Sequence, residues 1–155
     1  MRPAIAIALS ALFGMSTTNA LALDLKGDCQ VLKQIVEDAK NSFKDVRSDD
    51  RPLEMGTATT FDASVTFSDS QWCKVVISSK FFNENYSCDL RNTTMEATES
   101  FIKQCLGDMA TPDPEYQEDH FKVFRLASDG ASSVSIFKGG FPDLVQISVS
   151  AAEAR

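Results

Sequence analysis

Four cysteines carry the clearest chemistry in this chain of 155 residues: Cys29, Cys73, Cys88 and Cys105. An even number of cysteines in an exported chain favours disulfides, and four cysteines allow three connectivities. The sequence contains no C-x-x-C, so it indicates neither a redox-active pair nor a zinc ribbon. We therefore expect two structural disulfides and predict no metal site.

His120 is the only histidine, and it follows an acidic segment. A lone histidine binds a metal only together with carboxylates such as Glu118 or Asp119. No nucleophile motif of the G-x-S-x-G type accompanies His120, and no P-loop, dinucleotide-binding or H-E-x-x-H motif is present. We interpret His120 as an exposed histidine at a strand end, and we predict no catalytic residue and no cofactor.

Two carboxylate pairs, Asp49-Asp50 and Glu118-Asp119, leave one enzymatic alternative open. Neither pair has the spacing of a calcium loop. Glycosidase carboxylates must face each other across a cleft, and carboxylate pairs in polar loops usually lie on the surface. A small carboxylate-dependent hydrolase, using such a pair with or without His120, is therefore the competing hypothesis.

Three aromatic residues are the candidate binding residues: Trp72, Phe82 and Phe141. Strand alternation places Trp72 opposite to the face of Cys73, so Trp72 lies on an open sheet face if helices cover the other one. An exposed aromatic of this kind is a contact residue, unless a loop or a partner strand covers it. Phe141 follows two glycines at a hairpin tip and either inserts into a partner or packs on its own domain edge.

The amino end predicts a cleavable signal peptide over residues 1–22. Arg2 precedes an apolar run over residues 4–13, and Ala20-Leu21-Ala22 matches the small-x-small pattern of signal peptidase. The run is shorter than the ~20 residues of a membrane-spanning helix. The alternative is a buried amino-terminal helix. We expect a single domain over residues 23–155, located in the periplasm or secreted, without a membrane anchor.

Two amphipathic helices are predicted. The first covers residues 29–46, where apolar residues recur at helical spacing, and Asp28 is placed to cap it. The second starts at a capping box of Thr93 and Glu96 and ends near Gly107. Cys29 and Cys105 lie on the apolar stripes, so we expect a disulfide between the two helices.

Alternating apolar residues predict six strands, and residues 47–52 and 113–119 are interpreted as a polar connection and an acidic loop. A register that pairs Cys73 with Cys88 also brings Val75 opposite Tyr86, so these cysteines are the preferred second bridge. The strands cover approximately residues 57–67, 71–78, 86–90, 121–127, 134–138 and 144–150. The fold class is α+β, an antiparallel sheet of about six strands with two helices on one face, in the order α-β-β-β-α-β-β-β.

The formal net charge of −7 limits the classes of partner. An acidic domain repels phosphate backbones and gains little from anionic lipid, so we expect no nucleic acid partner. It suits a basic protein partner. We therefore expect an exported, non-catalytic binding or accessory protein, of the inhibitor or immunity type, acting on a basic enzyme such as a lysozyme.

Overall fold

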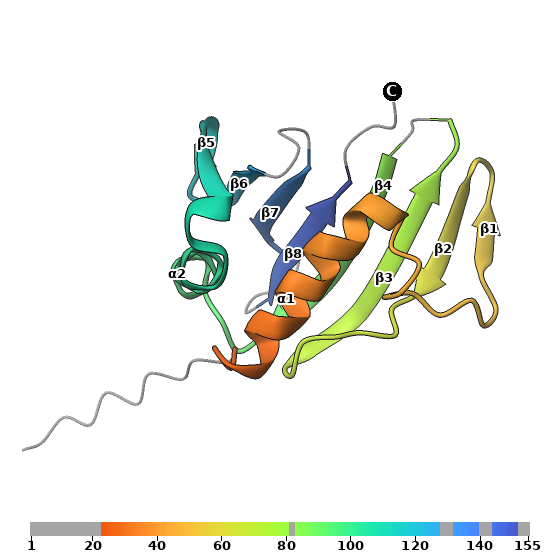
Figure 1. Cartoon of the computed structure of the whole chain (residues 1–155), viewed down its shortest axis with the longest axis horizontal. Coiled ribbons are helices and arrows are strands. Elements are labelled where there is room, and N and C mark those ends of the chain that lie inside the picture. Colours follow the sequence, from red (N-terminus) through yellow and green to blue (C-terminus); the bar gives the residue numbers. More distant parts are fainter. Residues whose placement is uncertain (1–22, 81–82, 128–131, 140–143, 152–155) are drawn as a thin grey trace, which may run out of the picture.

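Two α-helices and eight strands make up the part of the chain that the computed structural model describes, residues 23–80, 83–127, 132–139 and 144–151 (Figure 1). The first half contains α1 (Gly27–Asp38), β1 (Leu53–Met55), β2 (Ala58–Asp62), β3 (Ser70–Ser78) and β4 (Asn83–Arg91). The second half contains α2 (Met95–Leu106), β5 (Ala110–Glu118), β6 (Phe121–Leu126), β7 (Ser133–Lys138) and β8 (Leu144–Ser150). A short 3₁₀ turn follows each helix.

All eight strands form one antiparallel sheet in the order β1-β2-β3-β4-β8-β7-β6-β5. Each half of the chain is a helix followed by a four-stranded meander, and the two meanders join through β4 and β8. The strand order is therefore the same when read inward from either edge. The α+β class and the helix-meander repeat are confirmed, while the expected six strands and three-stranded meanders are corrected to eight and four in the described residues.

The two strands that sequence analysis missed are the edges of the sheet. All three residues of β1 are exposed, so no alternation marks this strand. Most of the segment predicted as an acidic loop, residues 113–119, belongs to β5, which ends at Glu118 and whose ladder is irregular between Pro112 and Gln117. Proline is tolerated on edge strands because one side of the strand needs no partner. A very short β1 and prolines in β5 also protect both edges against pairing with other chains.

The core lies between the helices and one face of the sheet. The register that joins Val75, Tyr86, Val149, Val134 and Phe124 across five strands runs along this face, and all five residues are buried. Figure 1 shows α1 lying across the sheet and α2 nearly end-on, close to β5 and β6. The opposite face is polar over much of β4 and β8 but includes Phe121, Val123 and Phe137 on β6 and β7. This alternation is the reason why the strands were predictable.

The first helix is shorter than predicted. It ends at Asp38, whose side chain turns back on the chain that follows and accepts hydrogen bonds from the backbone N–H groups of Asp45 and Val46, at 2.8 and 3.1 Å. Phe43 has left-handed backbone with φ 56°. Phe43 and Val46 are buried as the pattern requires, but in a folded-back loop and not on a helix face.

The helix caps differ from the predicted ones by small shifts. Thr94, and not Thr93, caps α2, and its Oγ1 accepts from the N–H of Ala97 at 3.2 Å. The helix ends at Gly107 as predicted, with φ 52°. At α1, Asp24 accepts from the N–H of Gly27 at 2.7 Å, so Asp24 takes the place expected for Asp28. Each of these side chains accepts a hydrogen bond from one of the backbone N–H groups that the first turn of a helix leaves free.

Glu99 on α2 links the helix to the sheet and provides a test of pH dependence. Its carboxylate lies 2.6 Å from Lys103 Nζ and 2.6 Å from Lys122 Nζ on β6. The hydrogen bonds from these two lysines lower the pKa of Glu99 below its ordinary value. The folded state therefore binds the proton of Glu99 more weakly than the unfolded state does. The stabilisation is present at neutral pH and is lost as the pH falls through the folded pKa.

We expect Glu99→Gln to lower the free energy of unfolding by about 1 kcal/mol at neutral pH, because the substitution removes the ion pairs with Lys103 and Lys122. The difference from the wild type should shrink as the pH falls from neutral through the lowered pKa of Glu99, because the glutamate is then protonated. Urea denaturation of both proteins across this range measures it. An equal difference at both ends of the range would show that the ion pairs contribute nothing.

Candidate functional site

Two disulfides connect the elements as the sequence predicts. Cys29 of α1 is bonded to Cys105 of α2, with 5.4 Å between the Cα atoms. Cys73 of β3 is bonded to Cys88 of β4. The first bridge joins the two halves of the fold, and the second joins neighbouring strands within one half. The two bridges therefore have different structural consequences.

Trp72 lies on the surface, directly before the second bridge. It is the only tryptophan of the chain, and 62% of its surface is exposed. The register between β3 and β4 shifts at this point, from Gln71 opposite Asp89 to Lys74 opposite Ser87. With Cys73 bonded to Cys88, Trp72 is the extra residue of a β-bulge, and its backbone is left-handed with φ 50°.

The bulge has a clear cause in the pattern of the strand. If the register of the rest of β3 continued without interruption, Gln71 would face Leu90, which is fully buried. The bulge places Ser70 opposite Leu90 and Gln71 opposite Asp89 on the polar face. Burial of a glutamine amide without partners costs more than the irregularity. Trp72 is the residue that this shift leaves unpaired.

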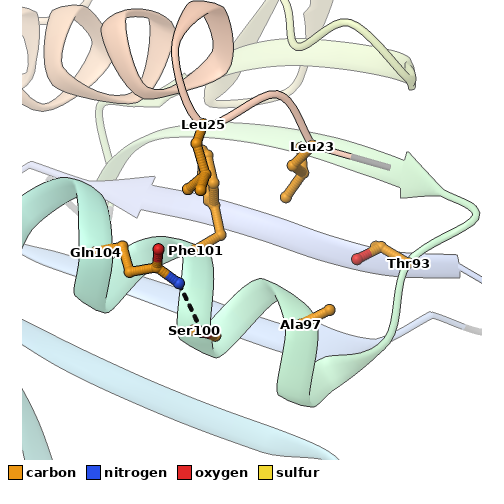
Figure 2. Close-up of a pocket in the computed structure, with 7 residues that line it drawn as sticks. All are labelled: Leu23, Leu25, Thr93, Ala97, Ser100, Phe101 and Gln104. Atoms are coloured by element: carbon orange, nitrogen blue, oxygen red, sulfur yellow. Dashed lines mark hydrogen bonds between the residues drawn. The ribbon is translucent and has the colours of Figure 1, made fainter. Parts of the chain in front are cut away.

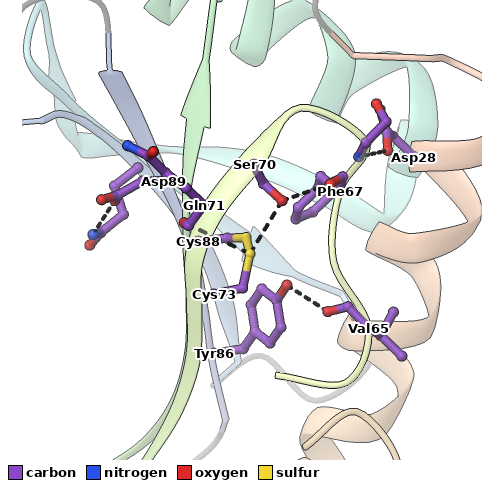
Figure 3. Close-up of a disulfide and its surroundings, with 11 residues drawn as sticks. Asp28, Val65, Phe67, Ser70, Gln71, Cys73, Tyr86, Cys88 and Asp89 are labelled. Atoms are coloured by element: carbon purple, nitrogen blue, oxygen red, sulfur yellow. Dashed lines mark hydrogen bonds between the residues drawn. A yellow bond between two sulfur atoms is a disulfide. The ribbon is translucent and has the colours of Figure 1, made fainter. Parts of the chain in front are cut away.

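The chain around the bulge is held by hydrogen bonds on both sides (Figure 3). Ser70 Oγ donates to the carbonyl of Phe67 at 2.6 Å, and the hydroxyl of Tyr86 donates to the carbonyl of Val65 at 2.9 Å. Burial raises the pKa of the Tyr86 phenol. On the polar face, Asp89 Oδ1 accepts from Gln146 Nε2 at 2.7 Å. These hydrogen bonds therefore hold the backbone around Trp72 in place.

The other predicted binding residues cannot be placed beside Trp72. Phe82 and Phe141 lie outside the described residues. Among the described residues, five other large apolar side chains are exposed, and none belongs to β3: Leu25, Leu53, Met55, Met109 and Tyr116. Tyr116 packs edge-on against Phe121, whereas Met55 is 64% exposed on β1. Trp72 is the candidate site residue whose exposure the structure supports.

The titratable residues considered for catalysis lie on the surface. His120 Nε2 is 3.1 Å from Glu118 Oε2, and the two side chains are 71% and 61% exposed at the turn between β5 and β6. Asp49 and Asp50 are exposed in a loop, where Asp49 pairs with Arg47. Within the described residues no group of histidine, cysteine and acidic side chains is arranged to hold a metal ion.

The structure contains a small apolar pocket that sequence analysis missed (Figure 2). Its volume is about 120 Å³, and it lies between the segment that precedes α1 and one side of α2. Leu23 and Leu25 face Phe101 across it, and the Gln104 amide donates to Ser100 at its rim. Only the packing of residues 23–26 on α2 creates it, so no local pattern could have indicated it. A second, more polar hollow of about 300 Å³ lies at the amino end of α2.

The acidic charge has an uneven distribution. Residues 104–121 contain no lysine or arginine but five acids, Asp108, Asp113, Glu115, Glu118 and Asp119. Asp113 is buried, with Oδ2 2.6 Å from Arg125 Nη2 in an ion pair that is poorly directed as a hydrogen bond. Glu115, Glu118 and Asp119 are exposed. The edge strand β5 therefore presents negative charge to solvent.

Comparisons with known proteins do not assign this chain to a family. In the described residues, neither helix is long and apolar enough to cross a membrane. No family model, no curated protein and no solved structure matches the chain.

Proposed function

We propose that this chain is an exported, non-catalytic binding or accessory protein, of the inhibitor or immunity type, that docks on a basic enzyme through Trp72. The observation that carries the proposal is the exposure of the single tryptophan in a left-handed bulge residue. The two disulfides fit an oxidising compartment. Export would follow from the signal peptide over residues 1–22.

The conformation of Trp72 is energetically unfavourable within this chain. Left-handed backbone costs a residue with a Cβ atom roughly 1–2 kcal/mol, and bulky residues rarely adopt it. The side chain also leaves most of its apolar surface in water, so packing within the described residues does not compensate fully. Strained residues of this kind cluster at functional sites. Tryptophan is also among the residue types most enriched at the energetic centres of protein interfaces.

Charge supports a basic partner. The net charge is −7, and residues 104–121, which include β5, contain five acids and no lysine or arginine. Opposite charges steer encounter and raise association rates, and this effect weakens as salt screens the surface. For the competing hydrolase, Glu118 and His120 lie exposed at the turn between β5 and β6, whereas Asp119 lines the polar hollow at the amino end of α2 together with Glu96.

We expect Trp72→Ala to weaken binding to a basic lysozyme by a factor of about 30 or more, as truncation of a central interface tryptophan does. Met55→Ala is the matched control, because Met55 is as exposed as Trp72 but lies on the edge strand β1. Calorimetric titration at low and high salt measures both affinities. The wild-type affinity should also fall as salt rises.

Two results would contradict the proposal. One is equal affinity of the wild type and the Trp72→Ala variant for every basic protein that binds. The other is an affinity that is the same for basic and acidic proteins of similar size, because charge would then have no part in partner choice.

A further inference from the structure

We infer that the two disulfides have separate tasks: Cys73–Cys88 positions Trp72 for binding, and Cys29–Cys105 stabilises the fold. The consequence for affinity rests on the function proposed above. The consequence for Trp72 in the free protein does not. Both bridges lie in the same domain, so each serves as the control for the other.

The position of the second bridge in the ladder selects Trp72 as the unpaired residue. Gln71 pairs with Asp89 on one side of the bulge, and Cys73 is bonded to Cys88, the residue before Asp89. No residue of β4 therefore remains for Trp72. The bond also fixes the end of the bulge that hydrogen bonds alone would leave free to slip, because one extra residue can be accommodated at more than one place in a ladder.

The alternative is a regular register between β3 and β4, in which the ladder has no bulge. Without a bulge, Trp72 would pair with Asp89 and adopt ordinary strand geometry, which removes its left-handed strain. The opposing cost is that Gln71 would then face the buried Leu90. The bulged register therefore has the cost of a strained Trp72, and the regular register has the cost of a buried Gln71. Cys73 would still face Cys88 in the register without a bulge, so the burial of Gln71 is what opposes that register. The bond excludes a different register, in which the bulge lies one residue later and Trp72 faces Cys88.

The span of each bridge supports the division of tasks. Cys73 and Cys88 are separated by 15 residues, and Cys29 and Cys105 by 76. On the chain-entropy model the stabilisation by a disulfide grows with the length of the loop that it closes. The strands β3 and β4 are also already paired along most of their length. We therefore expect the short bridge to contribute less to the stability of the fold than the long bridge does.

The test uses the fluorescence of Trp72, which reports on this position alone because the chain has no other tryptophan. Two double variants of the oxidised, exported protein are compared, Cys73→Ala/Cys88→Ala and Cys29→Ala/Cys105→Ala. Circular dichroism first establishes a temperature at which both are folded. Acrylamide quenching and steady-state anisotropy then compare Trp72 with the wild type.

We expect the quenching constant of Trp72 to change by about twofold, and its anisotropy to change, only when the Cys73–Cys88 bridge is absent. The long-bridge variant should show wild-type quenching with a lower melting temperature. Should the alanine pair fail to fold, Cys73→Val/Cys88→Val keeps the apolar contact between the strands without the bond. Wild-type quenching and anisotropy in whichever of these short-bridge variants folds would overturn the inference.

A second measurement separates this inference from the proposed function. Affinity for a basic lysozyme should fall about tenfold in the short-bridge variant and stay unchanged in the long-bridge variant. If the wild type binds no basic protein, the proposed function fails, but the quenching result still decides whether the bridge positions Trp72. If the short-bridge variant shows altered quenching with unchanged affinity, Trp72 is positioned by the bond but is not the contact, and the role in binding is refuted.

Discussion

Replacement of Cys29 and Cys105 by alanine is expected to lower the free energy of unfolding by about 4 kcal/mol. The bridge closes a segment of 76 residues and joins α1 to α2, so the unfolded chain gains much freedom when it is removed. A loss of this size is a large part of the 5–15 kcal/mol that is typical of a small domain.

Chemical denaturation monitored by far-UV circular dichroism measures this loss, with the Cys73→Ala/Cys88→Ala variant as the comparison. The short-bridge variant should lose clearly less stability, because its loop is shorter. Should the two variants lose equal stability, the helix-to-helix bridge would have no special structural role. The m-value must also be compared, because a more compact or more expanded unfolded state changes it.

Replacement of Asp28 by alanine is the second large effect, about 3 kcal/mol. Asp28 is 2% exposed, and its carboxylate accepts three hydrogen bonds at 2.7 Å, from Ser68 N, Ser68 Oγ and the backbone N–H of Asp24. It ties the start of α1 to the loop that leads into β3. Alanine would leave buried donors without an acceptor, and bonds to a charged acceptor are the costly ones to lose.

Thermal and urea unfolding of Asp28→Ala measure this effect. Asp50→Ala is the control, since Asp50 is an exposed aspartate and its removal should change the free energy of unfolding by less than about 0.5 kcal/mol. A loss below about 1 kcal/mol for Asp28→Ala would mean that water replaces the carboxylate without penalty. In that case the loop before β3 would not depend on α1.

Those elements whose apolar pattern reaches the core were predictable from the sequence. Both disulfide pairings followed from stripe and register arguments, because Cys29, Cys73, Cys88 and Cys105 all lie on apolar faces. Edge strands do not have this pattern. The strand β5 carries two prolines and several acids, and the core is not the reason for its extended shape. The prolines and acids of this segment therefore indicated a loop over residues 113–119, although most of it is a strand.

The site itself was only partly predictable. The pattern left open whether Trp72 is exposed or covered by a loop or a partner strand, and in the structure it is 62% exposed. Alternation alone would also have paired it with Asp89 in a regular strand. The bulge results from competition between Gln71 and Ser70 for the position opposite the buried Leu90. That competition depends on which strand lies beside β3 and in which register. The bulge is therefore a property of the assembled sheet and could not be predicted from the residues of β3 alone.

The binding role of Trp72 is most directly tested by the NMR signal of its indole N–H. Protein labelled with ¹⁵N gives one indole resonance, because the chain has one tryptophan, and an unlabelled basic lysozyme adds none. We predict that this resonance shifts or broadens in a saturable way during the titration and returns to its free position at high salt. If backbone resonances elsewhere shift on binding while the indole resonance stays in place, Trp72 is not the contact and the proposed function is wrong.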